Sequence, residues 1–163
     1  MNINMKIQDC EIRLILPDIR SAHNVGAIFR TADAFGVSKI LISGYTPTPI
    51  DRFGRERNDI SKASLGAQNA VSWEEIDNII EYIKKSKEEG FEVVSLEISP
   101  DSVQISEYQK KKKIILVVGN EINGIDKDIL EISDQILEIP MMGQKESMNV
   151  SVSTGIALYA LSN

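Results

Sequence analysis

The sequence predicts an α/β protein with a mostly parallel β-sheet and helices on both faces. Short runs rich in isoleucine, leucine and valine alternate with stretches of helical apolar spacing, which is the pattern of parallel strands joined by helices. One run, KIILVVG (113–119), is apolar almost throughout and is therefore expected at the centre of the sheet. With 163 residues, 42% of them hydrophobic, the chain is expected to form one domain, 1–163.

Each expected element follows from its apolar spacing and from the residue that stops it. Prolines end two strands, at Pro17 and Pro100, and glycines close two helices, at Gly36 and Gly90. The clearest helix is EEIDNIIEYIKKSKEE, whose isoleucines form one stripe. In chain order the expected elements are strand 12–16, helix 24–35, strand 39–43, short helix 59–65, helix 74–89, strand 91–98, strand 113–119, one or two helical turns at 126–132, strand 135–140 and helix 148–161.

The net charge of −6 is unevenly distributed along the chain. Residues 13–73 have eight basic and five acidic side chains, whereas residues 74–107 have three basic and ten acidic ones. Arg52, Arg55 and Arg57 stand together in DRFGRERND, within the basic third. Because a phosphate backbone responds to the local field, a protein with an acidic pI can still bind RNA through such a face.

Composition argues against several classes of protein. No apolar run reaches the ~18 residues of a membrane-spanning helix, and the N-terminal MNINMKIQDC lacks the apolar core of a signal peptide. The single cysteine, Cys10, has no partner for an internal disulfide, which suits a reducing cytoplasm. With one histidine and one cysteine, a metal site built from such ligands is not expected. The expected protein is cytoplasmic, without a membrane segment or a metal.

Ligands of such sheets usually lie at the carboxyl ends of the strands, and three stretches near expected strand ends have unusual composition. The first is NVGAIFR (24–30). On a helix, Gly26 and Arg30 lie one turn apart and away from the core, so a ligand could approach the backbone beside Arg30. Asn24 stands where a helix cap belongs. A surface arginine, a packing glycine and an ordinary cap would explain the same residues.

The second stretch is GNEING (119–124), directly after the expected central strand. Gly119 and Gly124 suit a tight turn or a close approach of the backbone to a ligand. Glu121 between them could orient an arginine or a hydroxyl group. The stretch lacks the GK[ST] of a phosphate loop. A plain turn with a solvated glutamate is the alternative.

The third stretch is IPMMGQKESMN (139–149), which leads into the last helix. Its methionines could line a pocket for a purine or a thioether, because methionine adapts to irregular shapes. Small polar residues, including Ser147 and Asn149, crowd the start of the helix and exceed what one cap needs. Close helix packing, such as a dimer contact, explains these residues equally well.

Together the three stretches resemble the signature motifs of the SpoU (TrmH-like) branch of the SPOUT RNA methyltransferases. The motifs are N-x-G-x-x-x-R at 24–30, G-x-E-x-x-G at 119–124, and I-P-M at 139–141 followed by S-[LM]-N-V-S at 147–151. The segment KASLGAQNAVSW (62–73) also looks like the one that follows the first motif in this family. The motifs occur in the family's order, and the resemblance covers nearly the whole chain.

The resemblance implies a fold, a cofactor and an activity. The fold would be an α/β knot, with the C-terminal segment threaded into a trefoil. The knot loops would bind S-adenosyl-L-methionine, and a homodimer would complete the active site. A methyl group would pass to a ribose 2′-hydroxyl in RNA, with tRNA slightly favoured over rRNA. No separate RNA-binding domain is expected, so RNA selection would rest on this domain, on the dimer or on a helper protein.

The resemblance also implies site residues. The cofactor would contact Leu96, Gly119, Ile139 and Ser147, and the catalytic group would be Asn24, Arg30, Glu121 and Asn149. Arg52, Arg55 and Arg57, expected to contact the RNA, follow from the charge distribution and not from the resemblance. Arg30 either takes the ribose proton while transiently neutral, or stays charged, binds the adjacent phosphate and stabilises the forming alkoxide. The second role is favoured, because a guanidinium rarely gives up its proton. Glu121 is expected to hold Arg30 by a bidentate pair, and Asn149 to orient the sugar or Arg30.

Two other functions are compatible with this composition and fold class. One is a non-catalytic RNA-binding or ribosome-assembly module on the same fold. The intact motif residues Arg30, Glu121 and Asn149 argue against it. The other is a nucleotide-binding phosphotransferase, which is disfavoured because the sequence has neither a phosphate loop nor an evident cluster of metal ligands.

Overall fold

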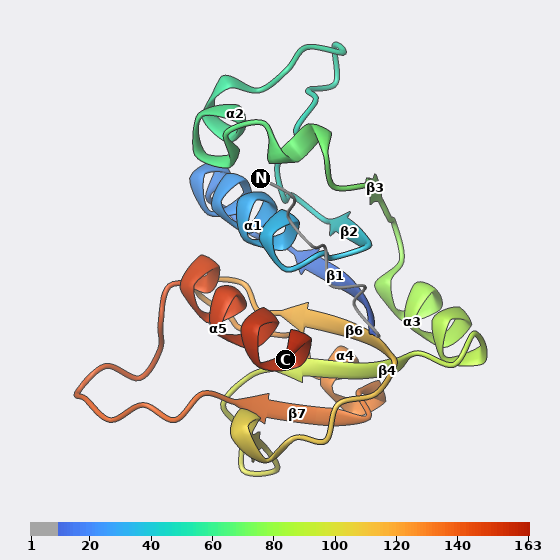
Figure 1. Cartoon of the computed structure of the whole chain (residues 1–163), viewed down its shortest axis with the longest axis vertical. Coiled ribbons are helices and arrows are strands. Elements are labelled where there is room, and N and C mark those ends of the chain that lie inside the picture. The colour runs from blue at the N-terminus through green and yellow to red at the C-terminus, as the bar shows by residue number, and fades with distance from the viewer. Residues whose placement is uncertain (1–9) are drawn as a thin grey trace, which may run out of the picture.

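The computed structural model describes residues 10–163, which form a seven-stranded sheet with helices on both faces (Figure 1). The strand order is β3-β2-β1-β6-β4-β7-β5, and all paired strands run parallel. β6 stands fourth of the seven, so the apolar run expected at the centre of the sheet lies there. The strands are β1 (Glu11–Pro17), β2 (Lys39–Ser43), β3 (Trp73–Glu75), β4 (Glu92–Leu96), β5 (Val103–Gln104), β6 (Lys113–Val118) and β7 (Gln135–Glu138).

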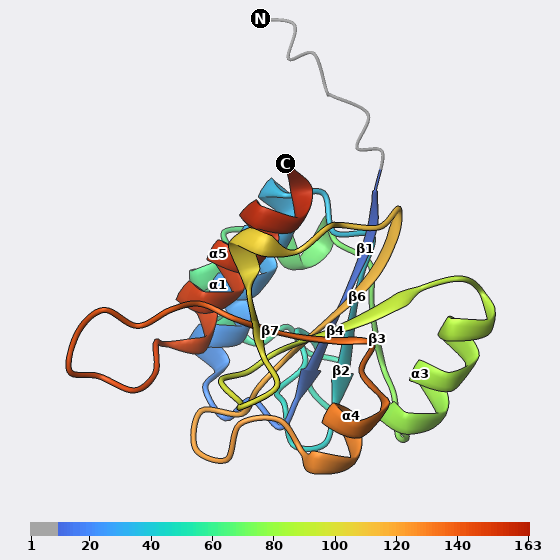
Figure 2. The same ribbon diagram turned by 90° about the horizontal axis from the view of Figure 1, so that it is seen from below.

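Side chains of the central strands alternate between two hydrophobic cores. In β1, Leu14 and Leu16 belong to one core and Ile15 to the other, because successive side chains of a strand point to opposite faces. Figure 2 shows α1 and α5 on one side of the sheet and α3 and α4 on the other. The fold class predicted from sequence is therefore confirmed. The helices are α1 (Ala22–Ala34), α2 (Asn58–Ser64), α3 (Ile79–Glu88), α4 (Lys127–Ile132) and α5 (Val150–Ser162), with short 3-10 turns at Ala67–Asn69 and Ile105–Glu107.

The structure differs from the sequence prediction mainly in the start of α3 and in two short strands, β3 and β5. The helix expected over 74–89 begins only at Ile79, where the Asn78 side chain accepts a hydrogen bond from the Glu81 N–H and caps it. The residues before it, Trp73–Glu75, pair with β2 and form the edge strand β3. Sequence spacing missed β3 and the two-residue strand β5, because both are too short to show a period.

The strands β4, β6 and β7 end at the same level, at the carboxyl end of the sheet. Leu96, the last residue of β4, is paired with Val118 of β6 on one side and with Leu137 of β7 on the other. The loops that leave these strands therefore start side by side, although they lie far apart in the sequence. They include two of the three predicted motif stretches, 119–124 and 139–149. The trefoil knot stays a prediction from the family resemblance.

None of the helices formed by residues 10–163 has both the length and the apolar character needed to cross a membrane.

Candidate active site

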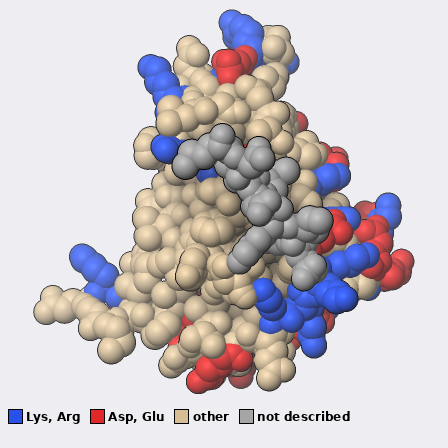
Figure 3. All heavy atoms as spheres, viewed as in Figure 1, with Lys and Arg blue, Asp and Glu red and all other residues tan. Residues whose placement is uncertain are grey.

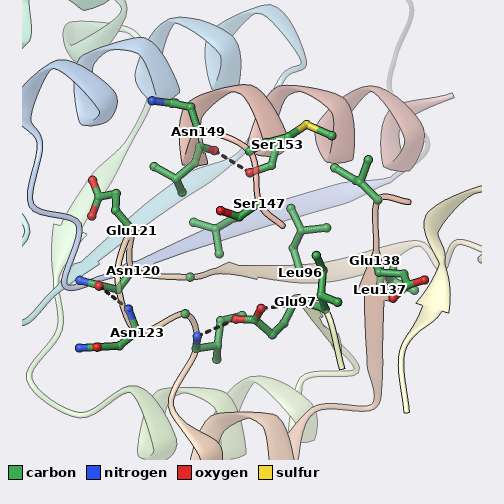
Figure 4. Close-up of a pocket in the computed structure, with 18 of the residues that line it drawn as sticks. Leu96, Glu97, Asn120, Glu121, Asn123, Leu137, Glu138, Ser147, Asn149 and Ser153 are labelled. Atoms are coloured by element: carbon green, nitrogen blue, oxygen red, sulfur yellow. Dashed lines mark hydrogen bonds between the residues drawn. The ribbon is translucent and has the colours of Figure 1, made fainter. Parts of the chain in front are cut away.

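A cavity of about 650 Å³ opens at the carboxyl ends of β4, β6 and β7. Its walls come from the ends of these strands, from the 119–124 turn, from the 139–149 loop and from the first turn of α5. Figure 4 shows Leu96, Leu137 and Ser147 around this space, with Glu121 and Asn149 at one side of it. All four residues predicted to contact a cofactor line the cavity, namely Leu96, Gly119, Ile139 and Ser147.

The 119–124 turn folds back tightly on itself. Asn120 and Gly124 exchange two backbone hydrogen bonds of 2.9 and 3.1 Å. A Cβ atom at Gly119 would lie only 3.0 Å from the Gly124 Cα, so a side chain there would force the two arms of the turn apart. Gly124 itself has a φ of +70°, in the left-handed region that favours glycine. The two motif glycines therefore hold the shape of the cavity wall.

The third motif forms the start of α5. Asn149 is the N-cap, because its Oδ1 accepts hydrogen bonds from the Ser151 N–H at 2.9 Å and from the Ser151 hydroxyl at 2.7 Å. The cap fixes the Asn149 side chain with its amide nitrogen directed away from α5. Inside the helix, the Ser153 and Thr154 hydroxyls donate to the Val150 carbonyl. These hydroxyls are satisfied within α5, as expected for small polar residues in a helix.

A relay of side-chain hydrogen bonds joins all three motif stretches beside the cavity. The Asn149 amide donates to Asn24 Oδ1 at 3.1 Å, and the Asn24 amide donates to Glu121 Oε1 at 3.1 Å. Glu121 also accepts from the backbone N–H groups of Arg20 at 3.0 Å and Ser21 at 3.3 Å. The loop before α1, the 119–124 turn and the start of α5 are thus held together by one carboxylate and two amides.

The relay favours the ionised form of Glu121. Partial burial alone would raise the pKa of Glu121, but hydrogen bonds from the Arg20 N–H, the Asn24 amide and the Ser21 N–H outweigh it. The pKa of this carboxyl group is therefore lowered. A carboxylate that only accepts hydrogen bonds from neutral donors is a positioning group here. Its negative charge stays available to attract a cation to this side of the cavity.

The predicted pair between Glu121 and Arg30 is wrong within one subunit. Glu121 uses its oxygens on Arg20, Ser21 and Asn24. Arg30 is exposed on α1, does not line the cavity, and forms no ion pair or side-chain hydrogen bond with any residue in 10–163. The physical reason is geometric, because the Glu121 oxygens are already hydrogen-bonded to the backbone before α1 and to the Asn24 amide, while Arg30 lies on the exposed side of α1. Asn149 likewise bonds to Asn24 and does not hold Arg30.

Two further interpretations of the first motif need correction. The cap of α1 is Ser21, whose hydroxyl accepts from the Asn24 N–H at 3.2 Å, so Asn24 lies inside the first turn. Gly26 does not leave room for a ligand, because it is buried against α2. A Cβ there would lie 2.6 Å from the Ile60 carbonyl oxygen and 2.7 Å from the Ala63 Cβ. The packing interpretation of Gly26 is therefore the correct one.

The predicted RNA-binding arginines lie on the loop between β2 and α2, at the top of Figure 1. Arg55 pairs with Asp51 at 3.2 Å, and Arg57 pairs with Asp59 at 2.8 Å. Arg52 forms no ion pair within the described part of the chain. The three positive charges are thus unequally available to a partner, and none of them lies at the cavity of its own subunit.

Two residues that the sequence did not single out support the cavity. Glu97 follows β4 and accepts from the Ile125 N–H at 2.9 Å, which braces the end of the 119–124 turn. Asn120 donates to the Asp18 carbonyl and to the Tyr45 hydroxyl, so it ties the turn to the loops after β1 and β2. Neither residue has a sequence signal of its own, because Glu97 falls inside the expected strand 91–98 and Asn120 stands between the motif residues Gly119 and Glu121.

Residues 10–163 bring together no group of three or more histidine, cysteine, aspartate or glutamate side chains that could hold a metal ion.

The fold and the cavity together indicate a class of protein. A parallel α/β sheet with a cavity at the carboxyl ends of its strands, lined by both apolar and polar residues and by a carboxylate held in place, is typical of ligand-binding α/β domains. The model of the SpoU rRNA Methylase family matches residues 11–159. Because this match spans most of the chain, the chain belongs to that family.

Relatives with stated activities lie within this family. The chain is 36% identical over 142 residues to a tRNA (guanosine(18)-2′-O)-methyltransferase of Aquifex aeolicus, covering 87% of this chain and 64% of the relative. It is 34% identical over 145 residues to the 23S rRNA (guanosine-2′-O-)-methyltransferase RlmB of Neisseria meningitidis, covering 89% and 55%. The chain therefore spans less than two thirds of the length of either relative.

A solved structure confirms the fold. The AdoMet-bound rRNA methyltransferase of Sinorhizobium meliloti superimposes with a TM-score of 0.83 at 28% identity, covering 93% of this chain and 55% of that chain.

Proposed function

We propose that this domain transfers a methyl group from S-adenosyl-L-methionine to a ribose 2′-hydroxyl in RNA. The main support is the hydrogen-bond relay of Asn24, Glu121 and Asn149, which joins three distant motif stretches at one cavity. The named activities of the tRNA and rRNA relatives support the same class of reaction. A domain that only binds RNA has no need for a nucleotide-sized cavity braced in this way.

The cavity fits the proposed cofactor. Its volume of about 650 Å³ falls within the ~300–1,000 Å³ typical of small-molecule sites. Its apolar side chains suit a purine ring and a thioether chain, and the Gly119 backbone and the Ser147 hydroxyl offer polar partners. Leu96, Gly119, Ile139 and Ser147 would hold the cofactor, which supplies a methyl group already activated on a sulfonium. The protein's remaining task is to bind and orient the ribose and to assist the loss of its proton.

We infer that Arg30 acts at the cavity of a second copy of the chain. Arg30 has no partner among residues 10–163 and lies on the exposed side of α1, which packs between α2 and α5 (Figure 1). The neighbouring face of α5 exposes Val152, Ile156 and Tyr159, which are spaced so that they form one apolar stripe. Such a stripe is suited to burial against a partner. A homodimer would cover it and complete the site.

Two roles for Arg30 fit this arrangement. In the first, Arg30 is transiently neutral and takes the proton from the ribose 2′-hydroxyl. In the second, Arg30 stays charged, binds the adjacent phosphate and stabilises the forming alkoxide while solvent takes the proton. We favour the second role, because guanidinium keeps its proton in nearly all protein settings. In either role the ribose 2′-oxygen would form a bond to the methyl carbon while the bond from that carbon to the cofactor's sulfur breaks, which leaves a neutral thioether. The ribose hydroxyl would lose its proton in the same reaction.

We propose tRNA ahead of rRNA as the substrate and the cytoplasm as the place of the reaction. RNA selection would rest on this domain, on the dimer or on a helper protein. The first motif and the arginine-rich loop offer the basic groups that would meet the phosphate backbone. The base and position of the modified nucleotide follow from the test below.

Mapping ribose methylations tests the proposal in cells. RNA from cells with and without this protein is compared by resistance of the phosphodiester bond to alkaline cleavage, since a 2′-O-methyl group blocks that cleavage. We expect one or a few methylated riboses to disappear from tRNA. Loss of methylated riboses from rRNA alone would identify rRNA as the substrate. An unchanged methylation map would contradict the proposed activity.

Calorimetry with S-adenosyl-L-methionine separates the enzyme from the non-catalytic alternative. We expect saturable binding, and loss of binding when Gly119 is replaced by alanine, because its Cβ would push the turn apart. A protein that binds RNA but not this cofactor would be an RNA-binding or ribosome-assembly module.

A further inference from the structure

The loop between β2 and α2 presents an exposed aromatic ring between two arginines. The Arg52 and Arg55 guanidinium carbons lie 4.8 and 5.0 Å from the centroid of the Phe53 ring. The three residues are called the Phe53 cluster below. Figure 1 shows the loop projecting beyond α2, and Figure 3 shows basic side chains at that end of the molecule. Cation–π contacts of this kind are favourable within about 6 Å.

The tip of the loop is rigidly built. Asp51 Oδ1 accepts from the Phe53 N–H at 2.8 Å and from the Arg55 N–H at 3.0 Å, and the Asp51 N–H donates to the Arg55 carbonyl at 2.8 Å. Gly54, with a φ of +77°, turns the chain at a position that favours glycine. The hydrogen bonds from these N–H groups, the Arg55 one foremost, also lower the pKa of Asp51. The turn therefore fixes the backbone that carries Phe53 at the tip of the loop.

The base of the loop is closed as well. Ile50 and Glu56 form an antiparallel bridge, and the Arg57 N–H donates to the Pro49 carbonyl at 2.9 Å. Glu56 Oε1 accepts from the Gln68 amide at 2.7 Å, which anchors the loop to the turn after α2. The Phe53 cluster is thus presented on a closed, anchored loop.

The fold gives no reason for a phenylalanine at this position. Phe53 is 65% exposed and belongs to neither hydrophobic core. Its backbone N–H makes the turn, which any residue with an N–H could do. The exposed ring therefore offers an aromatic face on which a nucleobase can stack.

The two arginines of the cluster differ in freedom. The Arg55 guanidinium is held by the Asp51 carboxylate at 3.2 Å. Arg52 forms no ion pair within the described residues, so it can leave the ring without breaking one. The Phe53 ring and the paired Arg55 guanidinium thus offer a stacking surface. Arg52 beside them offers a mobile group that can bind a phosphate.

We propose that the Phe53 cluster is a platform on which one unpaired nucleobase of the RNA stacks, while Arg52 turns to the adjacent phosphate. This inference rests on the proposed function, because it specifies how the RNA substrate is held. Bases that are unpaired in loops and bulges stack on aromatic rings and guanidinium planes, whereas paired bases offer no free face. The cluster would therefore favour RNA with an unpaired nucleotide.

Binding to two RNA probes tests the platform. One probe is an RNA hairpin with a seven-nucleotide loop, and the other is a blunt RNA duplex with the same number of phosphates. Affinities of the wild type, Phe53→Ala, Phe53→Leu and Phe53→Trp are measured by fluorescence anisotropy at constant salt. We expect Phe53→Ala and Phe53→Leu to weaken hairpin binding about tenfold, as for loss of one base stack, and Phe53→Trp to keep it. Duplex binding should change less than about twofold, because no base face is available there.

Leu65→Ala provides a matched control. Leu65 is 67% exposed, close to the exposure of Phe53, and lies at the end of α2, but no arginine stacks on it. We expect its replacement to leave hairpin binding unchanged. Thermal melts accompany every variant, and Phe53→Ala should melt like the wild type because Phe53 packs in neither core.

Several results would overturn the platform. Unchanged hairpin binding by Phe53→Ala would do so, as would full binding by Phe53→Leu, which keeps an apolar contact but removes the ring. A change of oligomeric state in Phe53→Ala, measured by light scattering, would assign the ring to a contact between protein copies. Wild-type methyl transfer is measured in parallel, so that loss of the platform alone is distinguished from absence of the proposed activity.

Discussion

Glu121 and Arg30 are the two charged residues of the family motifs, and the structure treats them in opposite ways. Glu121 accepts hydrogen bonds from two backbone N–H groups and from Asn24, all within its own subunit. Arg30 has no ion pair or side-chain hydrogen bond among residues 10–163 and lies on an exposed helix face. The Glu121 carboxylate thus has its hydrogen-bond partners within its own subunit, whereas the Arg30 side chain has none among residues 10–163.

This difference indicates two kinds of motif residue. A residue whose polar groups are satisfied inside the chain holds the shape of the site, and its loss disturbs the fold locally. A charged residue without internal partners contributes little to folding, and its charge is available to a molecule outside the chain. Each prediction below tests one side of this division.

The largest effect is expected at Arg30. Arg30→Ala should lower the rate of methyl transfer to RNA by roughly 100- to 1,000-fold, as for loss of one group that stabilises charge in a transition state. Cofactor binding should not change, because Arg30 does not line the cavity. Transfer of a labelled methyl group and calorimetry measure the two quantities. Normal turnover in Arg30→Ala would show that Arg30 is not part of the active site.

Arg30→Lys separates the two proposed roles. Lysine keeps the positive charge but loses the planar fork of donors. Substantial rescue of turnover would favour simple charge stabilisation. Turnover as low as that of Arg30→Ala would mean that the guanidinium itself is required.

The next largest effect is expected on folding, at Gly26. Gly26→Ala should lower the free energy of unfolding by about 1–3 kcal/mol, because the new Cβ would collide with the backbone of α2. Urea denaturation measures it. If Gly26 instead left space for a ligand, the variant would fold normally and lose only binding.

Gly155→Ala is the matched control, since Gly155 also lies inside a helix. Its Cβ would lie 3.5 Å from the Thr31 Cγ2, which is an ordinary contact. We expect the free energy of unfolding to stay unchanged or to rise by roughly 0.5–1 kcal/mol, the usual gain when alanine replaces glycine in a helix.

A smaller effect is expected from the charge of Glu121. The pKa of Glu121 is lowered in the folded protein from its ordinary value of 4.5, so its ionisation stabilises the fold above that value. This contribution should disappear as the pH falls through the lower, folded pKa. It should stay below about 1 kcal/mol, because the group is exposed to solvent. Urea denaturation of wild type and Glu121→Gln between about pH 7 and pH 3 measures it. The stability difference between them should shrink on acidification, and a constant difference would contradict the role of the charge.

The smallest effects are expected among the loop arginines. Arg52→Gln should reduce the slope of log affinity against log salt for RNA by about 1, because Arg52 is free to bind a phosphate. Arg57→Gln should reduce it less, because Arg57 is paired with Asp59 at 2.8 Å. A salt series of RNA binding measures both slopes. Equal reductions would show that internal pairing does not limit the use of these charges.

Much of the fold could be read from apolar spacing. The runs that became β1, β2, β4, β6 and β7 were predicted, and β6 lies at the centre as its uniform apolar character indicated. The edge strands β3 and β5 and the true start of α3 were not predicted. Two or three paired residues have no period, and their pairing depends on a neighbouring strand that local sequence does not reveal.

For the candidate site, the sequence predicted residues that line the cavity but not the partners of the charged residues. The residues proposed to hold the cofactor line one cavity, because they stand at the end of a strand, directly after a strand or in the loop before α5. The partners of the charged residues were not predictable. Whether Glu121 meets Arg30 or the backbone before α1 depends on Å-scale competition between groups about 100 positions apart in the chain.

By itself, the sequence determined the alternation of strands and helices, the strand at the centre of the sheet and the three stretches that meet at its carboxyl edge. These follow from local chemistry, which each segment has before folding. Only the tertiary structure decided which polar groups are satisfied internally and which remain free, as Glu121 and Arg30 show. Hydrogen bonds are short and directional, so their partners are fixed only when the packed chain brings distant groups to within about 3 Å of each other.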